Sequence, residues 1–137
     1  MRPRWLAALL AAAVALTYAQ GAGHELLDYD DPRYVSDNPN LASGLSAAGI
    51  WQDLREPYFG NWIPLSHLSL RIDHALYGTH AAGYLLTNVA LHTGATLLLF
   101  AALLRLTGAP GRSAFVAAVF GLHPLHAESV AWVSERK

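Results

Sequence analysis

The stretch that decides the fold class is residues 83–106, which read GYLLTNVALHTGATLLLFAALLRL. It holds 24 residues and no charged side chain before Arg105. A helix needs about 20 apolar residues to cross a hydrocarbon layer about 30 Å thick, so this stretch predicts a membrane span. Its polar residues Asn88 and His92 are four apart and share one helix face, where we expect them to meet a neighbouring helix or a cavity.

A tight turn and a second apolar run follow this span. The turn is residues 107–112, TGAPGR, with a glycine near the expected helix end and a proline after it. Ser113 is predicted to cap the next helix, which stays apolar only as far as Leu122. Pro124 is expected to kink or end that helix. The connection is too short to hold a domain, so the two runs predict a membrane hairpin.

The N-terminus is a short basic segment followed by an uncharged apolar run from Trp5 to Ala19. Two interpretations remain open. A basic start, an apolar run rich in alanine and leucine, and small residues near position 19 fit a cleaved secretory signal peptide. The same run also fits an uncleaved first helix that continues through residues 20–23. In either case the chain after residue 20 is delivered to the outer side of a membrane.

Charge is distributed unevenly around the apolar segments. The basic residues that flank these segments are Arg2, Arg4, Arg105 and Arg112. Basic flanks tend to stay in the cytoplasm, so we expect the N-terminus and the turn at 107–112 to be cytoplasmic and residues 24–82 to lie outside. Three alternating spans satisfy both expectations, and this agreement favours an uncleaved first helix.

The composition points to a membrane protein. Hydrophobic residues make up 53% of the chain and charged residues 14%, a balance more apolar than that of an average globular domain. The absence of cysteine excludes a disulfide framework and a thiolate metal site. A formal net charge of -1 argues against nucleic acid as a partner.

The long polar section, residues 20–82, is acidic and contains two expected helices. Its charged residues are Glu25, Asp28, Asp30, Asp31, Asp37, Asp53, Glu56 and Asp73 against Arg33, Arg55 and Arg71. A short helix is predicted from Leu45 to Leu54, with Ser46 as its cap. From Pro64 to Tyr77, apolar residues recur at helical spacing, which predicts an amphipathic helix lying in the membrane interface. The alternative is a globular helix packed on a small core.

Residues 28–35, DYDDPRYV, place three carboxylates within four residues. Unpaired charges are costly to bury, so this cluster must lie in water or at a polar site. A solvated acidic turn is one interpretation. The other is a functional site, because a carboxylate in a partly dry outer cavity has a raised pKa that suits a general base acting on a hydroxyl.

The last 15 residues, HPLHAESVAWVSERK, form a second polar cluster that we expect on the same outer side. His123 and His126, with Glu128 nearby, could bind a divalent metal, although they lack the HExxH order and Pro124 disturbs the helix face. An arginine such as Arg136 suits recognition of a phosphate by forked hydrogen bonds. An acidic loop and an arginine at one membrane surface indicate a phosphate-linked lipid donor and a hydroxyl acceptor.

Motifs spread over the chain from about residue 25 to the end carry a family resemblance. They are Tyr29-Asp30-Asp31, Tyr34-Val35, Asn38-Pro39, Gly44-Leu45-Ser46, Gly49, Trp51, Asn61-Trp62, Pro64-Leu65, Asp73, Leu76-Tyr77-Gly78, Asn88, Leu91-His92, Arg105-Leu106-Thr107-Gly108, His123-Pro124-Leu125-His126, Glu128-Ser129-Val130-Ala131-Trp132-Val133 and Glu135-Arg136-Lys137. The chain resembles the N-terminal membrane part of tetratricopeptide-repeat proteins related to the transmembrane O-mannosyltransferases. It departs from that pattern at Ile63, where the family commonly has histidine.

The resemblance implies a fold and a reaction. The fold would be an all-α integral membrane fragment of the GT-C glycosyltransferase type, with three transmembrane helices and a long outer loop carrying short amphipathic helices. The chain would divide into a first helix or signal anchor at 1–23, an outer acidic loop with an interfacial helix at 24–82, and a helical hairpin with the terminal polar block at 83–137. Such enzymes pass sugar from a polyprenyl-phosphate carrier to a hydroxyl of a protein or glycan on the outer face.

The resemblance also implies roles for individual residues. Asp30 and Asp31 match the acidic pair of the first outer loop, where such enzymes keep their catalytic carboxylate. The residues that match the terminal block, and that are expected to bind substrate, are His123, His126, Glu128 and Arg136. Arg136 is the candidate phosphate ligand. No residue is assigned as a metal ligand, and the need for a divalent metal stays open.

Three function classes remain open from the sequence. The first is a membrane-embedded glycosyltransferase of the bacterial inner membrane, of which this chain would be a fragment that is inactive alone because further helices and repeats are needed. The second is a non-catalytic membrane anchor or scaffold of a tetratricopeptide-repeat protein. The third is a small secreted protein with a cleaved signal peptide, which the uncharged run after residue 83 disfavours.

Overall fold

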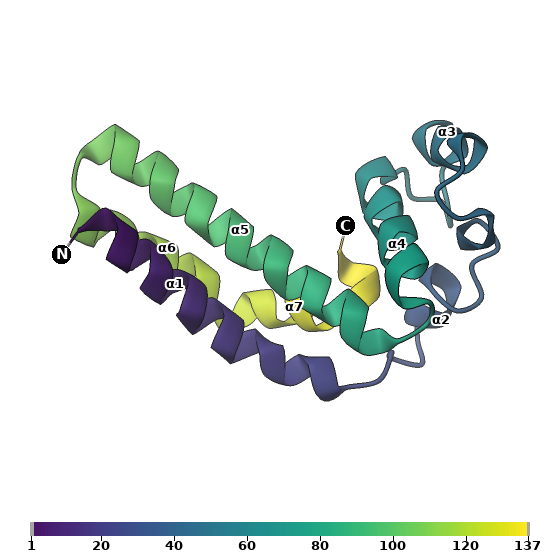
Figure 1. Ribbon diagram of the computed structural model, residues 1–137, viewed down its shortest axis with the longest axis horizontal. Coiled ribbons are helices and arrows are strands. Elements are labelled where there is room, and N and C mark those ends of the chain that lie inside the picture. Colours follow the sequence, from purple (N-terminus) through teal and green to yellow (C-terminus); the bar gives the residue numbers. More distant parts are fainter. Residues whose placement is uncertain (1, 137) are drawn as a thin grey trace.

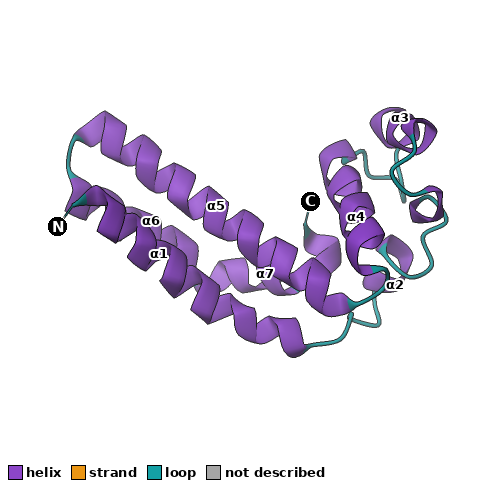
Figure 2. Ribbon diagram, in the orientation of Figure 1, coloured by secondary structure: helices purple, strands orange, loops and turns teal. Residues whose placement is uncertain are grey.

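The computed structural model describes residues 2–136, which form helices joined by short loops (Figures 1 and 2). The α-helices are α1 Pro3–Tyr18, α2 Asp31–Tyr34, α3 Ala47–Arg55, α4 Pro64–Tyr77, α5 Ala81–Thr107, α6 Pro110–Leu122 and α7 Ala127–Ala131. The 3₁₀ helices are η1 Ala19–Gly23, η2 Leu41–Ser43, η3 Pro124–His126 and η4 Val133–Glu135. The expected all-α class is confirmed for the described part of the chain.

Helices α1, α5 and α6 lie side by side as an elongated bundle (Figure 1). Its core contains Leu10, Phe100 and Ala117. A close approach occurs at Gly121 of α6, where a Cβ would lie 2.8 Å from side-chain atoms of both Val14 and Thr96. Only a residue without a side chain allows the three helices to pack this closely.

The turn between α5 and α6 was predicted correctly, and the cap after it was not. Gly108 ends α5 in the left-handed conformation, with φ 63°. Helix α6 begins at Pro110, whose fixed φ suits the first helical position, and Ala109 precedes it as the cap residue. Ser113 therefore lies inside the helix, where its hydroxyl donates to the Ala109 carbonyl at 2.9 Å.

Two helical segments are long and apolar enough to cross a membrane. They are Pro3–Gly23, which comprises α1 and η1, and Ala81–Thr107, which is α5. Helix α6 and the helical segment after it, Pro124–Ala131, meet at a bend of 48°. They form a third span only if the two segments cross the membrane together as one broken helix. The predicted break at Pro124 is confirmed.

The segments α2, α3 and α4 form a second unit beside the end of α5 (Figure 1). Its core contains seven buried apolar residues: Tyr34, Val35, Leu41, Leu70, Tyr84, Leu85 and Val133. Residues from the 24–82 section, from α5 and from the C-terminal segment thus share one core. The predicted cap at Ser46 is confirmed, because its hydroxyl accepts a hydrogen bond from the Gly49 N–H at 3.1 Å.

Helix α4 has the predicted bounds but buries the face that the sequence suggested was exposed. Arg71 and Asp73 are 0% and 2% exposed, whereas Leu65 and Leu76 are 78% and 67% exposed. Partners from other segments neutralise the buried charges, so the polar face packs inward. Leu70 of α4 is 2% exposed and lies in the core of this unit, so the alternative of a globular helix packed on a small core holds for the inner face of α4.

Candidate functional site

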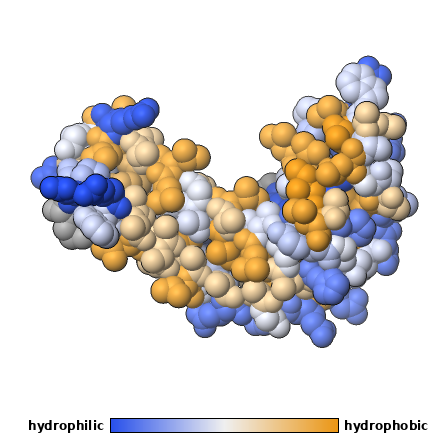
Figure 3. Space-filling model, in the orientation of Figure 1, coloured by the Kyte–Doolittle hydropathy of each residue, from blue (hydrophilic) through white to orange (hydrophobic). Residues whose placement is uncertain are grey.

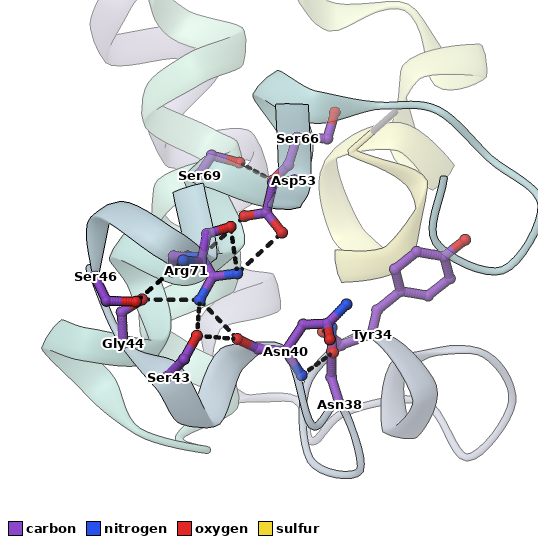
Figure 4. A network of polar contacts seen from close by, with 11 residues as sticks. Tyr34, Asn38, Asn40, Ser43, Gly44, Ser46, Asp53, Ser66, Ser69 and Arg71 are labelled. Carbon is purple, nitrogen blue, oxygen red and sulfur yellow. Dashed lines mark hydrogen bonds and ion pairs between the residues drawn. The ribbon is translucent and has the colours of Figure 1, made fainter. Parts of the chain in front are cut away.

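Two buried arginines organise the polar contacts around α4. Figure 4 shows the first, Arg71, whose side chain lies inside the unit formed by α2, α3 and α4. Its Nε and Nη2 donate to the two carboxylate oxygens of Asp53 on α3, at 2.8 and 2.9 Å. Its Nη1 donates to the Asn40 and Gly44 carbonyls at 2.6 and 2.8 Å. This forked arrangement fixes the loop at 40–49 against α4.

The second arginine, Arg136, joins the C-terminal segment to α4 and α5. Its Nη1 forms an ion pair of 2.6 Å with Asp73 Oδ2, and both side chains are almost completely buried. Its Nε donates to Asn88 Oδ1, and its Nη2 donates to the Tyr84 carbonyl at 2.8 Å. Its Nη1 also donates to Ser69 Oγ at 3.2 Å. These contacts occupy four of the five N–H donors of the guanidinium.

A pocket of about 270 Å³ lies beside Arg136, between α5, α7 and the C-terminal segment. Its lining combines polar and apolar side chains: Asn88, Leu91, His92, Ala95, Ser129, Val130, Glu135 and Arg136. The α5 members are spaced so that they form one helix face, as predicted for Asn88 and His92. The pocket is therefore the place where the shared polar face of α5 meets the terminal block.

Asn88 and His92 also anchor the neighbouring segments. Asn88 Nδ2 donates to the Val130 carbonyl at 3.1 Å. His92 Nε2 lies 3.0 Å from the Gly121 carbonyl. Because a carbonyl oxygen only accepts, this hydrogen bond requires a proton on Nε2. The His126 ring packs against His92 with centroids 5.2 Å apart.

Asp31 connects the acidic cluster to the terminal block. It is 1% exposed, and its Oδ1 accepts a hydrogen bond from the Ser134 N–H at 2.9 Å. Its Oδ2 accepts from the Leu27 N–H, also at 2.9 Å. The two polar clusters that the sequence places at opposite ends of the chain therefore meet in the fold.

The other predicted site residues lie at the surface around this junction. Asp30 precedes α2 and is partly exposed. Glu128 is exposed in the first turn of α7. His123 is exposed and its Nδ1 accepts from the Leu125 N–H at 3.2 Å, which caps η3. The structure thus brings Asp31, His126 and Arg136 into the contacts described above. Asp30, Glu128 and His123 instead remain exposed or partly exposed.

Within residues 2–136, no group of three histidine, aspartate or glutamate side chains is placed to hold a metal ion. The metal hypothesis for His123, His126 and Glu128 therefore has no geometric support in this structure. The break at Pro124 separates His123 from His126 and Glu128, as the disturbed helix face suggested.

A buried histidine lies on α4 beside the Arg71 network. His67 is 3% exposed, and its ring packs edge-on against Tyr58 with centroids 5.0 Å apart. Burial lowers the pKa of the His67 imidazole below its ordinary value, an effect that Asp53 opposes and Arg71 reinforces. Burial also raises the pKa of the Tyr58 phenol. His67 Nε2 has no hydrogen-bond partner among the described residues.

Sequence reasoning missed the partners that hold the site together. Asp73 and Arg71 stand two apart on α4, and each is paired with a residue from another segment, Arg136 or Asp53. The sequence signal that could have indicated buried ion pairs is the presence of Arg71 and Asp73 on one helix, in a chain that has few charged residues. Such residues are rarely buried unless they are paired.

Curated proteins of one kind match this chain. Protein O-mannosyl-transferase Tmtc1 of Drosophila melanogaster is 35% identical over 115 residues, which cover 75% of this chain and 13% of that protein. Protein O-mannosyl-transferase TMTC2 of Homo sapiens is 32% identical over 116 residues, which cover 79% of this chain and 14% of that protein. Protein O-mannosyl-transferase TMTC4 of Homo sapiens is 25% identical over 158 residues, which cover 98% of this chain and 21% of that protein.

The match extends over most of this chain and a small part of each relative, between 13% and 21% of its length. No family model matches the chain. No solved structure gives a significant match. The relatives support the resemblance to O-mannosyltransferases that the motifs indicated.

Proposed function

We propose that this chain is the membrane-embedded start of a glycosyltransferase of the GT-C type, which transfers sugar from a polyprenyl-phosphate carrier to a hydroxyl of a protein or glycan acceptor. The observation that carries the proposal is its similarity to proteins named protein O-mannosyl-transferases, which covers up to 98% of this chain. The two helices of membrane length support it. The donor, the acceptor and the tetratricopeptide repeats that would follow belong to the proposal.

The charge pattern supports the proposed orientation. The N-terminus and the α5–α6 turn, with their four exposed arginines, lie at one end of the bundle (Figure 1). The acidic unit of α2, α3 and α4 lies at the other end. We place the arginine-rich end in the cytoplasm and residues 24–82 outside. The ion pair between Asp73 and Arg136 fits this orientation, because a third crossing by α6 and the segment after it returns Arg136 to the outer side.

The solvent exposure of each side chain decides the role that we assign to it. Asp30 is partly exposed, so we assign it the role of general base on the acceptor hydroxyl. Asp31 holds two backbone N–H groups and is assigned the positioning of Asp30 and of the terminal block. Arg136, which lines the pocket, is assigned to donor binding, together with His123, His126 and Glu128 of the terminal block, which lie outside the pocket lining. Arg136 has at most one N–H left for a phosphate oxygen, so it would bind phosphate as one contact among several.

We further propose that the chain alone does not transfer sugar. Pockets that enclose small ligands usually have volumes of about 300–1,000 Å³. The pocket beside Arg136 holds about 270 Å³, which is too small for a sugar together with its lipid phosphate. The relatives are much longer than this chain, which leaves room for further membrane helices. Such helices would enlarge and close the site.

The proposal is tested by measuring sugar transfer in a longer protein that contains this sequence. Polyprenyl-phosphate mannose serves as donor, because mannose is the sugar in the name of the relatives. Asp30→Asn is expected to lower the turnover by about 10²-fold or more, as for the loss of a general base. Asp28→Asn, an exposed neighbour in the same cluster, is the matched control and should retain activity. Full activity of Asp30→Asn would refute the assignment.

The engagement of Asp31 and Arg136 in structural contacts favours a second candidate, a non-catalytic anchor or scaffold. In that case Asp30→Asn and Asp31→Asn both leave sugar transfer by the complete protein unchanged, provided that the variants fold. The same assay therefore separates the two functions.

A further inference from the structure

Helix α4 presents an apolar stripe that no described segment covers. We define the α4 stripe as Leu65, Leu68, Ile72 and Leu76, which recur at helical spacing along one face. Three of them are strongly exposed: Leu65 by 78%, Ile72 by 41% and Leu76 by 67%. At 1.5 Å per residue, the stripe is about 16 Å long. A row of exposed leucine and isoleucine side chains of this length is unfavourable in contact with water.

The stripe carries no charge, although α4 contains charged residues. Both of these, Arg71 and Asp73, are buried and paired with Asp53 and Arg136. The helix thus turns its charges into the protein and Leu65, Ile72 and Leu76 outward. Such an arrangement is unfavourable against water and favourable against an apolar environment.

The position of α4 next to the membrane identifies that environment. Only residues 78–80 separate α4 from α5, the clearest membrane span, so the end of α4 lies where α5 enters the apolar layer. Helix α5 itself carries an exposed leucine near its start, Leu86, which is 49% exposed. Figure 3 shows hydrophobic side chains on the α4 unit, on the side that faces the hollow toward the bundle.

Aromatic residues flank the stripe at both ends. Trp62 precedes α4 and is 64% exposed, and its Nε1 donates to the Leu54 carbonyl at 3.2 Å. Tyr77 ends the helix and is also exposed. Tryptophan and tyrosine concentrate at the boundary between headgroups and acyl chains, because their rings have an apolar body and a polar group.

We propose that the α4 stripe lies in the headgroup and acyl-chain boundary of the membrane leaflet at this end of the bundle, with the buried charges of α4 facing the protein. The helix then runs along the membrane surface, and lipid fills the hollow between α4 and the bundle. This arrangement places the pocket beside Arg136 next to lipid. It does not depend on the proposed sugar transfer.

Site-directed spin labelling tests this arrangement, because the chain has no native cysteine. The full chain is reconstituted into phosphatidylcholine vesicles with one cysteine at Leu65→Cys or Leu76→Cys, and collisions of the label with oxygen and with a water-soluble nickel complex are measured. Asp37→Cys, in an exposed loop, is the water-facing control. Leu98→Cys, which is 72% exposed in the middle of α5, is the lipid-facing control.

The expected result is a ratio of oxygen to nickel collisions at positions 65 and 76 that is several-fold above that at 37 and shifted toward that at 98. A ratio equal to that at 37 would show that the stripe lies in water and would overturn the proposal. An immobilised label with low access to both reagents would show that protein covers the stripe, either a second copy or another chain, and would also overturn it.

A charge-bearing variant provides a second measurement. Leu65→Glu with Leu76→Glu places two carboxylates on the exposed stripe and leaves the buried contacts of Arg71 and Arg136 in place. In this background, a label at Ile72→Cys is expected to lose several-fold in its ratio of oxygen to nickel collisions, because the carboxylates draw the helix out of lipid. Leu27→Glu, an exposed leucine outside the stripe, is the control and should leave the ratio at position 72 unchanged. An unchanged ratio in the double variant would contradict lipid contact.

Discussion

The carboxylate of Asp31 and the backbone N–H of Ser134 form a buried hydrogen bond of 2.9 Å between residues 103 positions apart. It connects the start of α2 to the segment that carries Arg136. Because the second oxygen of Asp31 holds the Leu27 N–H, one side chain fixes two backbone segments at once. The acidic cluster and the terminal polar block are also joined by the Tyr29 and Trp132 rings, whose centroids lie 5.9 Å apart, and by Val133, which shares a core with Tyr34.

Replacing Asp31 is therefore expected to weaken the fold at this junction. Asp31→Ala leaves the buried Ser134 N–H without an acceptor and should lower the free energy of unfolding by about 3 kcal/mol. The value is measured by reversible unfolding in mixed detergent. Asp28→Ala removes an exposed carboxylate from the same cluster and should change the free energy of unfolding by less than about 0.5 kcal/mol. Equal effects of the two variants would contradict a bridging role for Asp31.

The ion pair between Arg136 and Asp73 predicts a larger effect. Arg136→Ala leaves the carboxylate of Asp73 buried without its cation, and the free energy of unfolding should fall by about 3–5 kcal/mol. The double variant Arg136→Ala with Asp73→Ala should lose less than the sum of the single variants, because no charge is left unpaired. Arg112→Ala, at the exposed turn, is the control. Additive losses would show that the two side chains do not interact.

Gly49 predicts a steric effect on the Arg71 network. A Cβ at this position would lie 2.6 Å from Ser43 Oγ and 2.7 Å from Arg71 Nη1. Gly49→Ala should therefore displace the guanidinium and lower the free energy of unfolding by about 1–3 kcal/mol. Gly94→Ala, in the middle of α5 with open space around the new methyl group, should instead raise the free energy of unfolding by about 0.5–1 kcal/mol. A stabilising Gly49→Ala would show that the loop at 40–49 is not held as described.

The buried imidazole of His67 predicts a dependence of stability on pH. Its pKa is lower in the folded chain than the value of about 6.5 expected in the unfolded chain. As the pH falls below about 6.5, the unfolded chain binds a proton at His67 more readily than the folded chain does, so the free energy of unfolding decreases. Above about pH 6.5 the imidazole is neutral in both states, and His67 no longer makes the free energy of unfolding depend on pH. His67→Phe cannot titrate and should lose this part of the decrease between pH 7 and pH 5.

The comparison is made with unfolding curves of both proteins at each pH. His24→Phe, at an exposed histidine, is the control and should follow the original chain. If His67→Phe and the original chain lose the same free energy of unfolding between pH 7 and pH 5, His67 is not the group responsible.

Much of the helical framework could be predicted because its signals are local. Ser46 caps α3 with its own hydroxyl, Gly108 ends α5 through its own backbone freedom, and Pro124 ends α6 through its missing N–H. The cap at Ser113 was wrong because Pro110 starts the helix three residues earlier. In each case the outcome depends on interactions within one turn of the chain.

The site was less predictable because its contacts join distant segments. Asp30, Asp31 and Arg136 were identified as candidates, but the burial of Asp31 and the pairing of Arg136 with Asp73 have no signature in the sequence. The same holds for Arg71, which periodicity placed on the polar face of α4 and the structure encloses completely.

Residues 83–106 are apolar over a length that matches the hydrocarbon layer, and this alone was enough to predict that α5 can span a membrane, because the free energy of transferring a segment into lipid is a sum over its own side chains. Which side of α4 faces the protein was decided only in three dimensions. A charge is buried or exposed according to the partner it meets, and Arg71 and Asp73 meet theirs, Asp53 and Arg136, only after the chain has folded.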